Sequence, residues 1–361
     1  MTENLNLKGE EKVVLQLRSL YSSYGYSTYK MSRFEEYDLY AGNKDFLVSN
    51  NIITFTDTDG TLMALKPDVT LSIVKSFRPS KASVSRVCYD ENVYRVSDKS
   101  GTFREILQTG IECLGDVSEV ELCEVVKLAQ LSLKKISQDS ILTISHMGIV
   151  EKFASKISSD NLKKQALESL ASRNFSSLEA LAKANEDDSE VLNKLAKLSM
   201  LMGPADEIYN QLRAMDADEQ ALKELERVVS VLDEKSLRID FSVLGEMNYY
   251  NGITFRGYVR DVPGSVLSGG QYDKLMKRLG KKAKAVGFAV YMDSLERVLT
   301  NSSEYDVDVA LIYSDKQSLK TVLETADSLR ANGKSVITLK EVPFSLRYRE
   351  LMVLEGGNQD A

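Results

Sequence analysis

The sequence has 361 residues, 43% hydrophobic and 27% charged, so it is long enough for two or three domains with a sizeable core. Its formal net charge of −7 argues against a dedicated nucleic-acid binder, because such proteins usually present a basic face, and we expect no tRNA partner. No apolar run approaches the roughly 20 residues that span a bilayer, and the N-terminus lacks a signal-peptide core. We therefore expect a cytoplasmic protein without membrane contact.

Three cysteines and one histidine limit the chemistry further. Cys88, Cys113 and Cys123 show no CxxC spacing, so we expect reduced thiols that pack as small core residues. A Ser-His-Asp triad would have to use His146, at the end of an apolar strand-like run, for which we favour a structural role. A multi-histidine metal site is excluded, and no glycine-rich phosphate loop occurs, so we expect neither a metal nor a cofactor.

The first predicted elements are a helix, a hairpin and a second helix. Apolar spacing predicts a helix over 9–24 that ends before a glycine. Alternating segments at 53–57 and 62–66 then flank an Asp59–Gly60 turn, which indicates a β-hairpin. The helix after Pro67 begins with Asp68 and Thr70, which are both favourable N-cap residues. Each of these two residues is either a cap or a ligand contact, or both.

Two long strands follow, over 82–96 and 104–116. Two-residue alternation in the second strand places Gln108, Gly110 and Glu112 on one face. That face is either solvated or lines a pocket. Because glycine leaves open space between the two polar side chains, we favour the pocket.

The rest of the chain changes character twice. A helix over 118–136 and a strand over 140–145 lead into residues 149–234, a run of amphipathic helices that we interpret as an insertion. Strand patterns return afterwards, and a β–α–β unit follows a short linker. We predict an α+β fold built on an antiparallel sheet with flanking helices, and the expected domains are a core of 1–148 with 235–303, the insertion 149–234, and a short α/β segment 306–361.

Six segments in this order resemble class II histidyl-tRNA synthetases over roughly residues 8–300. "GYSTYKMSRFEEYDLY" resembles motif 1, the dimer-forming segment, and "LKPDVT" resembles the amino-acid-binding "LRPE-T" signature. "VYRVSD" with "REILQTGIECLG" resembles motif 2, and "LGEMNYYNGITF" resembles the histidine-specific "RGLDYYTGTVF". "SGGQYDKLM" resembles "GGRYDGL", and "AVGFAVYMDSLERVL" resembles motif 3. The resemblance implies a class II synthetase-like fold and a homodimer.

This chain departs from the family mainly at positions where the family has a cationic residue. Gly245 stands where the family has the arginine that acts on the adenylate phosphate, and Asn248 stands at its aspartate position. An ungapped match puts Ser294 at the ATP-binding arginine of motif 3, Gln271 replaces another arginine, and a gap would bring Arg297 to the motif 3 position. Removing one preorganised donor typically lowers a rate on the order of 10²–10³-fold. We therefore expect negligible aminoacylation and assign no catalytic residue.

The residues that match the family's histidine-binding positions are retained more fully. Asp68 and Thr70 match positions that hold the α-amino group, and Gln108 and Glu112 match positions that contact the amino group and the imidazole. Arg95 matches a position that faces the ligand carboxylate, although a surface ion pair is the alternative. Tyr249 and Tyr250 match the paired tyrosines that wall the ring. Because neighbouring residues alternate, we expect only one of them, Tyr250, to face the pocket and the other to be core.

A kept histidine pocket without ATP chemistry resembles one branch of the family, the regulatory subunits of ATP phosphoribosyltransferase. The resemblance implies a non-catalytic partner of the short-form catalytic subunit in a hetero-octamer, with histidine as feedback ligand in the first step of histidine biosynthesis. One alternative is a divergent active histidyl-tRNA synthetase that draws its cation from Arg256 or Arg260. Another is a free-standing amino-acid sensor or ligase. The C-terminal segment is expected to be too short for a complete anticodon-binding domain.

Overall fold

The computed structural model describes residues 9–43, 52–79, 83–96, 101–244, 249–299 and 305–354. The chain divides into two compact units. One spans Lys12–Val298, and the other contains the C-terminal segment from Leu299 onward. Each unit has its own sheet, so the two are described separately.

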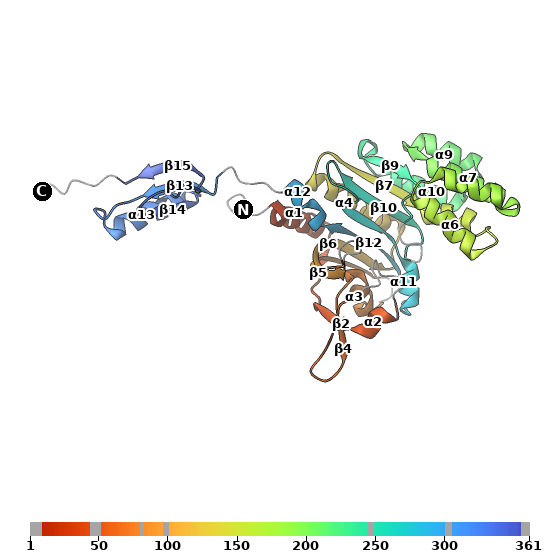
Figure 1. Cartoon of the computed structure of the whole chain (residues 1–361), viewed down its shortest axis with the longest axis horizontal. Coiled ribbons are helices and arrows are strands. Elements are labelled where there is room, and N and C mark those ends of the chain that lie inside the picture. Colours follow the sequence, from red (N-terminus) through yellow and green to blue (C-terminus); the bar gives the residue numbers. More distant parts are fainter. Residues whose placement is uncertain are drawn as a thin grey trace. The chain divides into compact units, whose positions relative to one another are not determined.

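A nine-stranded sheet forms the centre of the larger unit (Figure 1). Neighbouring strands are antiparallel except for the β1–β5 and β7–β9 pairs, which are parallel. The order across the sheet is β1 (Ser27–Thr28), β5 (Val84–Val96), β6 (Phe103–Gly115), β12 (Lys284–Tyr291), β11 (Leu267–Gln271), β10 (Ile253–Val259), β7 (Ser140–His146), β9 (Leu237–Asp240) and β8 (Met202–Gly203). The predicted α+β fold with a largely antiparallel sheet is confirmed.

Two long helices pack against one face of this sheet. They are α1 (Gly9–Ser23) and α4 (Glu119–Ile136), and Tyr21 Oη of α1 lies 3.1 Å from Ser132 Oγ of α4 in a buried hydrogen bond. A Ser118–Glu121 capping box begins α4, as its sequence favours. The predicted first helix ends as expected, since Gly25 follows it with a positive φ of 81°.

The opposite face of the sheet carries a second apolar core. It is covered by α2 (Tyr37–Ala41), α3 (Val69–Ser76), α11 (Asp273–Arg278) and the small sheet of β2 (Phe34–Glu36), β4 (Leu62–Leu65) and β3 (Thr54–Thr56). Leu71 of α3 and Leu275 of α11 belong to one buried cluster with Leu114 of β6. The predicted hairpin around Gly60 is the β3–β4 pair, and its turn glycine has φ 91°. This face also holds the cavity described below.

Helices dominate the segment between β7 and β9. They are α5 (Met147–Ala154), α6 (Asp160–Ala171), α7 (Phe175–Ala184), α8 (Ser189–Met200), α9 (Ala205–Ala214) and α10 (Glu219–Ser230). Arg173, after α6, forms an ion pair with buried Asp240 of β9, which ties these helices to the sheet. The two-residue strand β8 lies among them and is missed by sequence periodicity, since two residues are too short to show one. That 149–234 is a separate inserted domain stays a prediction.

The smaller unit contains a three-stranded parallel sheet in the order β14 (Val336–Leu339), β13 (Val307–Ile312) and β15 (Tyr348–Val353). Helix α13 (Leu319–Ala331) connects β13 to β14, which confirms the predicted β–α–β unit. Strand β15 was not predicted. In the larger unit, the "DSLERVL" end of the motif 3 match forms a 3-10 turn, η4 (Asp293–Leu295), followed by α12 (Glu296–Leu299).

Candidate functional site

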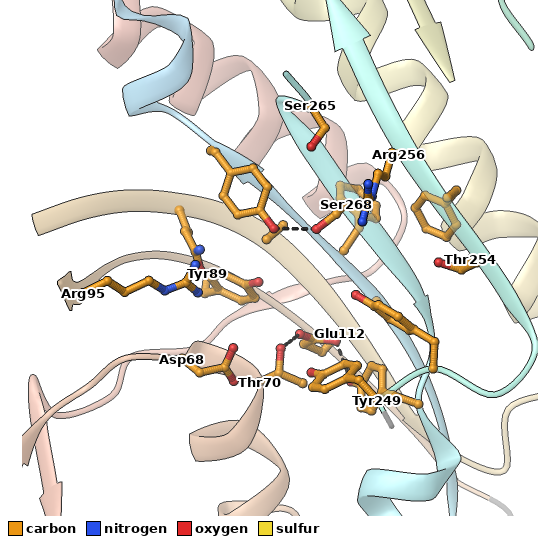
Figure 2. Close-up of a pocket in the computed structure, with 18 residues that line it drawn as sticks. Asp68, Thr70, Tyr89, Arg95, Glu112, Tyr249, Thr254, Arg256, Ser265 and Ser268 are labelled. Atoms are coloured by element: carbon orange, nitrogen blue, oxygen red, sulfur yellow. Dashed lines mark hydrogen bonds between the residues drawn. The ribbon is translucent and has the colours of Figure 1, made fainter. Parts of the chain in front are cut away.

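A cavity of about 300 Å³ opens on the sheet face that α3 covers (Figure 2). Its walls come from the start of α3, from β5, β6, β10, β11 and β12, and from the tyrosine pair before β10. All seven residues that the sequence predicts as a histidine site line it: Asp68, Thr70, Arg95, Gln108, Glu112, Tyr249 and Tyr250. The structure therefore brings these residues together, while the identity of their ligand stays a prediction.

Asp68 and Thr70 reach the cavity from the N-terminus of α3. Asp68 caps the helix by accepting a hydrogen bond from Leu71 N at 2.8 Å, and it lines the cavity as well. Removal from solvent raises the pKa of the Asp68 carboxyl, against the lowering effects of the Leu71 amide and of Arg95. Thr70 donates its hydroxyl to Glu112 Oε1 at 2.6 Å. For Asp68, capping and cavity lining hold together.

Glu112 presents a buried carboxyl, of which 2% is exposed. Thr70 donates to one of its oxygens, and Tyr272 donates its hydroxyl to the other at 2.5 Å. Burial raises the pKa of Glu112 from 4.5 to about 8, although both hydrogen bonds act to lower it. Such a carboxyl exchanges its proton near neutral pH, so it is suited to a ligand N–H whose own pKa is close, as that of imidazole is.

Glycines allow close packing around the cavity, and one of them packs against the Glu112 carboxyl. Gly287 of β12 pairs with Glu112, and a Cβ at that position would lie 1.8 Å from Glu112 Oε2. A Cβ on Gly270 would lie 2.7 Å from the Tyr250 ring. The open space expected above Gly110 is not there, because Tyr89 fills it and its hydroxyl would lie 2.6 Å from a Cβ. The side chain that closes this space is itself a cavity wall.

Both tyrosines of the pair line the cavity, so the expectation that only one of them faces it is wrong. Two-residue alternation applies within a strand, and Tyr249 and Tyr250 precede β10 in irregular backbone. Their rings meet edge to face with centroids 4.8 Å apart, and Tyr249 also lies 5.6 Å from the Tyr272 ring. Tyr249, 8% exposed, thus serves the core and the cavity at once.

Tyr89, Tyr272 and Arg256 are among the cavity residues that sequence reasoning did not assign to the site. Tyr272 lies within "GGQYD", a segment that was matched to the family without any role for its tyrosine. Arg256 was considered only as a replacement cation. Alternation along β10 was a usable signal for it, because Thr254 and Arg256 fall on the same face as the cavity.

Arg95 and Arg256 are the cationic residues lining the cavity within the described part of the chain. Arg95 Nε donates to Pro67 O at 2.9 Å, so its position is fixed beside Asp68 rather than by a surface ion pair. Arg260, the other replacement that the sequence offered, lies outside the cavity and pairs with Asp139 at 3.4 Å. Gly245 and Asn248 lie outside the described residues, and Ser294 lies in η4 away from the cavity lining.

Gln271 does not line the cavity, which corrects its interpretation as one of the lost cations of the site. In β11 the cavity side carries Ser268 and Gly270, so alternation turns Gln271 to the other side. There its side chain accepts from Ile253 N and donates to Glu224 of α10 at 3.2 Å. A glutamine at this position removes no cation from the cavity.

His146 caps a helix, and the three cysteines pack in or near the core without disulfides. His146 Nδ1 accepts from Gly148 N at 3.0 Å and so caps α5, outside the cavity. Cys88 and Cys113 are buried and Cys123 is half-buried, all with free thiols.

Among the described residues no cluster of His, Cys, Asp and Glu is placed to hold a metal ion. In the same residues no helix combines the length and apolarity needed to cross a bilayer.

Comparison with known proteins agrees with this fold. The family model described as "Histidyl-tRNA synthetase" matches residues 5–295. A solved structure titled as an ATP phosphoribosyltransferase regulatory subunit/histidyl-tRNA synthetase from Bacillus halodurans is similar with a TM-score of 0.79 and 24% identity, over 96% of this chain and 93% of that one. The sheet with its cavity is thus that of the class II synthetase-like proteins.

A relative with higher sequence identity indicates which branch of this family the chain belongs to. The ATP phosphoribosyltransferase regulatory subunit of Clostridium kluyveri is 30% identical over 337 residues, covering 88% of this chain and 85% of the relative. A chain of the solved ATP phosphoribosyl transferase (HisG:HisZ) complex from Thermotoga maritima has a TM-score of 0.61 at 22% identity, over 78% of this chain and 97% of that one. The chain belongs to the family of ATP phosphoribosyltransferase regulatory subunits, within the histidyl-tRNA synthetase family.

Proposed function

We propose that this protein is a non-catalytic regulatory subunit that binds L-histidine in the cavity and reports it to an ATP phosphoribosyltransferase catalytic subunit. The observation that carries the proposal is the buried Glu112 carboxyl, held by Thr70 and Tyr272 at the wall of an aromatic cavity. A buried acceptor of this kind is matched by the N–H of an imidazole ring.

The other cavity residues suit the rest of the ligand. The ring would lie against Tyr249 and Tyr250, and the α-amino group would be held by Asp68, Thr70 and Gln108. Gln108 is 3% exposed, so its amide is removed from competing water. Arg95 adds a positive charge beside Asp68.

We further propose that the synthetase reaction has been lost. Adenylate formation requires fixed cations at the phosphate, and the positions where the family carries them hold Gly245 and Ser294 here. The C. kluyveri relative is named a regulatory subunit, which supports a non-catalytic role.

A short-form catalytic subunit is the proposed partner, in a cytoplasmic hetero-octamer whose regulatory subunits form homodimers. The name of the T. maritima complex supports such a partnership. Titration calorimetry with L-histidine and with the purified catalytic subunit tests both parts. We expect binding in each titration, and absence of both with folded proteins would contradict the proposal.

One observation favours a second candidate, a divergent active histidyl-tRNA synthetase. Arg256 lines the cavity and supplies a cation there. Histidine-dependent ATP–pyrophosphate exchange separates the two. We expect none, and a rate that depends on Arg256 would favour the synthetase.

The raised pKa of Glu112 predicts how histidine binding depends on pH. The free carboxyl keeps its proton below about pH 8, whereas free imidazole takes up a proton below about pH 6.5. The complex needs one proton between the two groups, so binding exchanges no proton with solvent between these values. Affinity should be flat from about pH 6.5 to 8 and should fall by up to about tenfold per unit on either side.

Calorimetry in buffers of different ionisation enthalpy checks this profile. The matched control is Glu112→Gln, in which the loss of affinity that begins near pH 8 should disappear. The ligand's α-amino group titrates equally against both proteins, so it cancels in the comparison. Identical profiles for the two proteins would show that Glu112 is not the proton-sharing partner.

A further inference from the structure

The cavity contains a guanidinium, that of Arg256, for which the described residues provide no ion-pair partner. Arg256 lies on β10, half-buried, with its side chain on the cavity face. Within the described part of the chain, no carboxylate lies within 4.0 Å of it and its guanidinium makes no hydrogen bond, whereas Arg260 pairs with Asp139. A partly desolvated cation without an anion is unfavourable. Its position therefore suggests that the missing anion comes with the ligand.

The groups beside Arg256 are neutral hydroxyls. Figure 2 shows Arg256, Ser265 and Ser268 on one side of the cavity, with Asp68, Thr70 and Glu112 on the other. Ser268 Oγ and Tyr291 Oη lie 2.5 Å apart in a hydrogen bond, so their oxygens are held at the Arg256 side. The cavity thus has the Arg256 guanidinium at one end and the carboxyl groups of Asp68 and Glu112 at the other, which complements the two ends of an amino acid.

The second arginine of the cavity, Arg95, differs from Arg256 in that its guanidinium makes a hydrogen bond within the protein. Arg95 donates Nε to Pro67 O and lies beside Asp68. Burial raises the pKa of Asp68 and the Arg95 charge acts against that rise, so this guanidinium already has an acidic neighbour. Arg256 has no carboxylate within 4.0 Å among the residues that the structure describes. A guanidinium binds a carboxylate strongly through charge-assisted hydrogen bonds, and more so when no internal acid competes.

We propose that Arg256, rather than Arg95, binds the carboxylate of the amino-acid ligand and makes the site selective for amino acids over amines and alcohols with the same side chain. This proposal rests on the proposed function, because it takes histidine as the ligand. Gly245 carries no charge, so Arg256 on β10 would supply a cation that position 245 does not.

The test compares L-histidine with L-histidinol, in which an alcohol replaces the carboxylate, by calorimetry on the full chain. The wild-type protein should prefer histidine by at least about tenfold, as expected for a charge-assisted contact. Arg256→Gln should weaken histidine by that factor, leave histidinol unchanged and so abolish the preference. Arg256→Lys should keep part of it. Thermal unfolding of each variant checks that the fold is kept.

Two matched controls complete the design. Arg260→Gln removes an exposed cation just beyond the end of β10 and should change neither affinity. Arg95→Gln should keep the preference for histidine. If Arg256→Gln keeps the preference and Arg95→Gln loses it, the present proposal is overturned while histidine binding stands. If the wild-type protein does not bind histidine at all, the proposed function fails and this proposal fails with it.

Discussion

Replacing Glu112 with glutamine should weaken L-histidine binding by about ten- to a hundredfold, the range expected for losing a hydrogen bond to a charged partner. The variant keeps the shape of the carboxyl but cannot share a proton with imidazole. One amide atom can still accept from Tyr272, and the other can donate to the Thr70 hydroxyl. The effect should therefore fall on the ligand and not on the fold.

Stability measurements separate these two effects. Glu112 keeps a proton in the folded protein up to about pH 8, whereas its ordinary pKa is 4.5, so folding binds a proton between these values. The free energy of unfolding of the wild type should therefore fall, relative to Glu112→Gln, as pH rises from 4.5 to 8. Urea unfolding at several pH values measures this, and the variant should be at least as stable as the wild type above neutral pH.

A second glutamate on the same strand is the matched control. Glu105 is exposed and bonds to Asn92 and Tyr94, away from the cavity lining. Glu105→Gln should leave histidine affinity unchanged. In the reconstituted complex, Glu112→Gln should also lose feedback inhibition by histidine. Normal inhibition in that variant would mean that the ligand does not use Glu112.

Within single strands, the sequence was enough to predict which residues share a face. Alternation along β6 placed Gln108 and Glu112 together, and both line the cavity. The same rule predicted wrongly for Tyr249 and Tyr250, because these residues lie outside a strand. Two-residue alternation in β11 also turns the Gln271 side chain away from the cavity, so the sequence contained a signal against its role there.

The residues that were missed depend on long-range pairing. Gly287 is required by Glu112 only because β12 and β6 pair in that register, which no local pattern shows. Tyr272 reaches Glu112 across 160 positions of sequence. Tyr89 fills the space above Gly110 because β5 pairs with β6. Local periodicity therefore identifies candidate faces, while the shape of the cavity is set by strand register.

The segment that carries Asp68 rests on a buried ion pair, which leads to the largest expected effect on stability. Lys66 has a fully buried side chain and donates Nζ to Glu91 Oε2 at 2.8 Å. Backbone contacts hold the same segment, since Tyr94 N donates to Lys66 O and Arg95 Nε to Pro67 O. Removing Glu91 would leave the ammonium buried without a partner. We expect Glu91→Ala to lower the free energy of unfolding by about 3–5 kcal/mol.

The partner variant should behave differently, and that asymmetry is the informative result. Lys66→Met removes the fully buried charge and leaves Glu91, whose side chain is 15% exposed and so keeps part of its hydration. It should therefore destabilise the protein by less than Glu91→Ala does. It should also keep histidine affinity, because the backbone contacts that place Asp68 do not need the ammonium. Adding Lys66→Met to Glu91→Ala should therefore restore most of the lost stability.

Urea unfolding of the two single variants and the double variant measures this coupling. Asp139→Ala, which breaks the exposed pair with Arg260, should change stability by less than about 1 kcal/mol. If Glu91→Ala and Lys66→Met proved equally destabilising, mutual attraction would be the main contribution of the pair. The predicted asymmetry instead assigns the effect to the desolvated Lys66 charge, whose burial makes Glu91 necessary for placing Asp68 at the cavity.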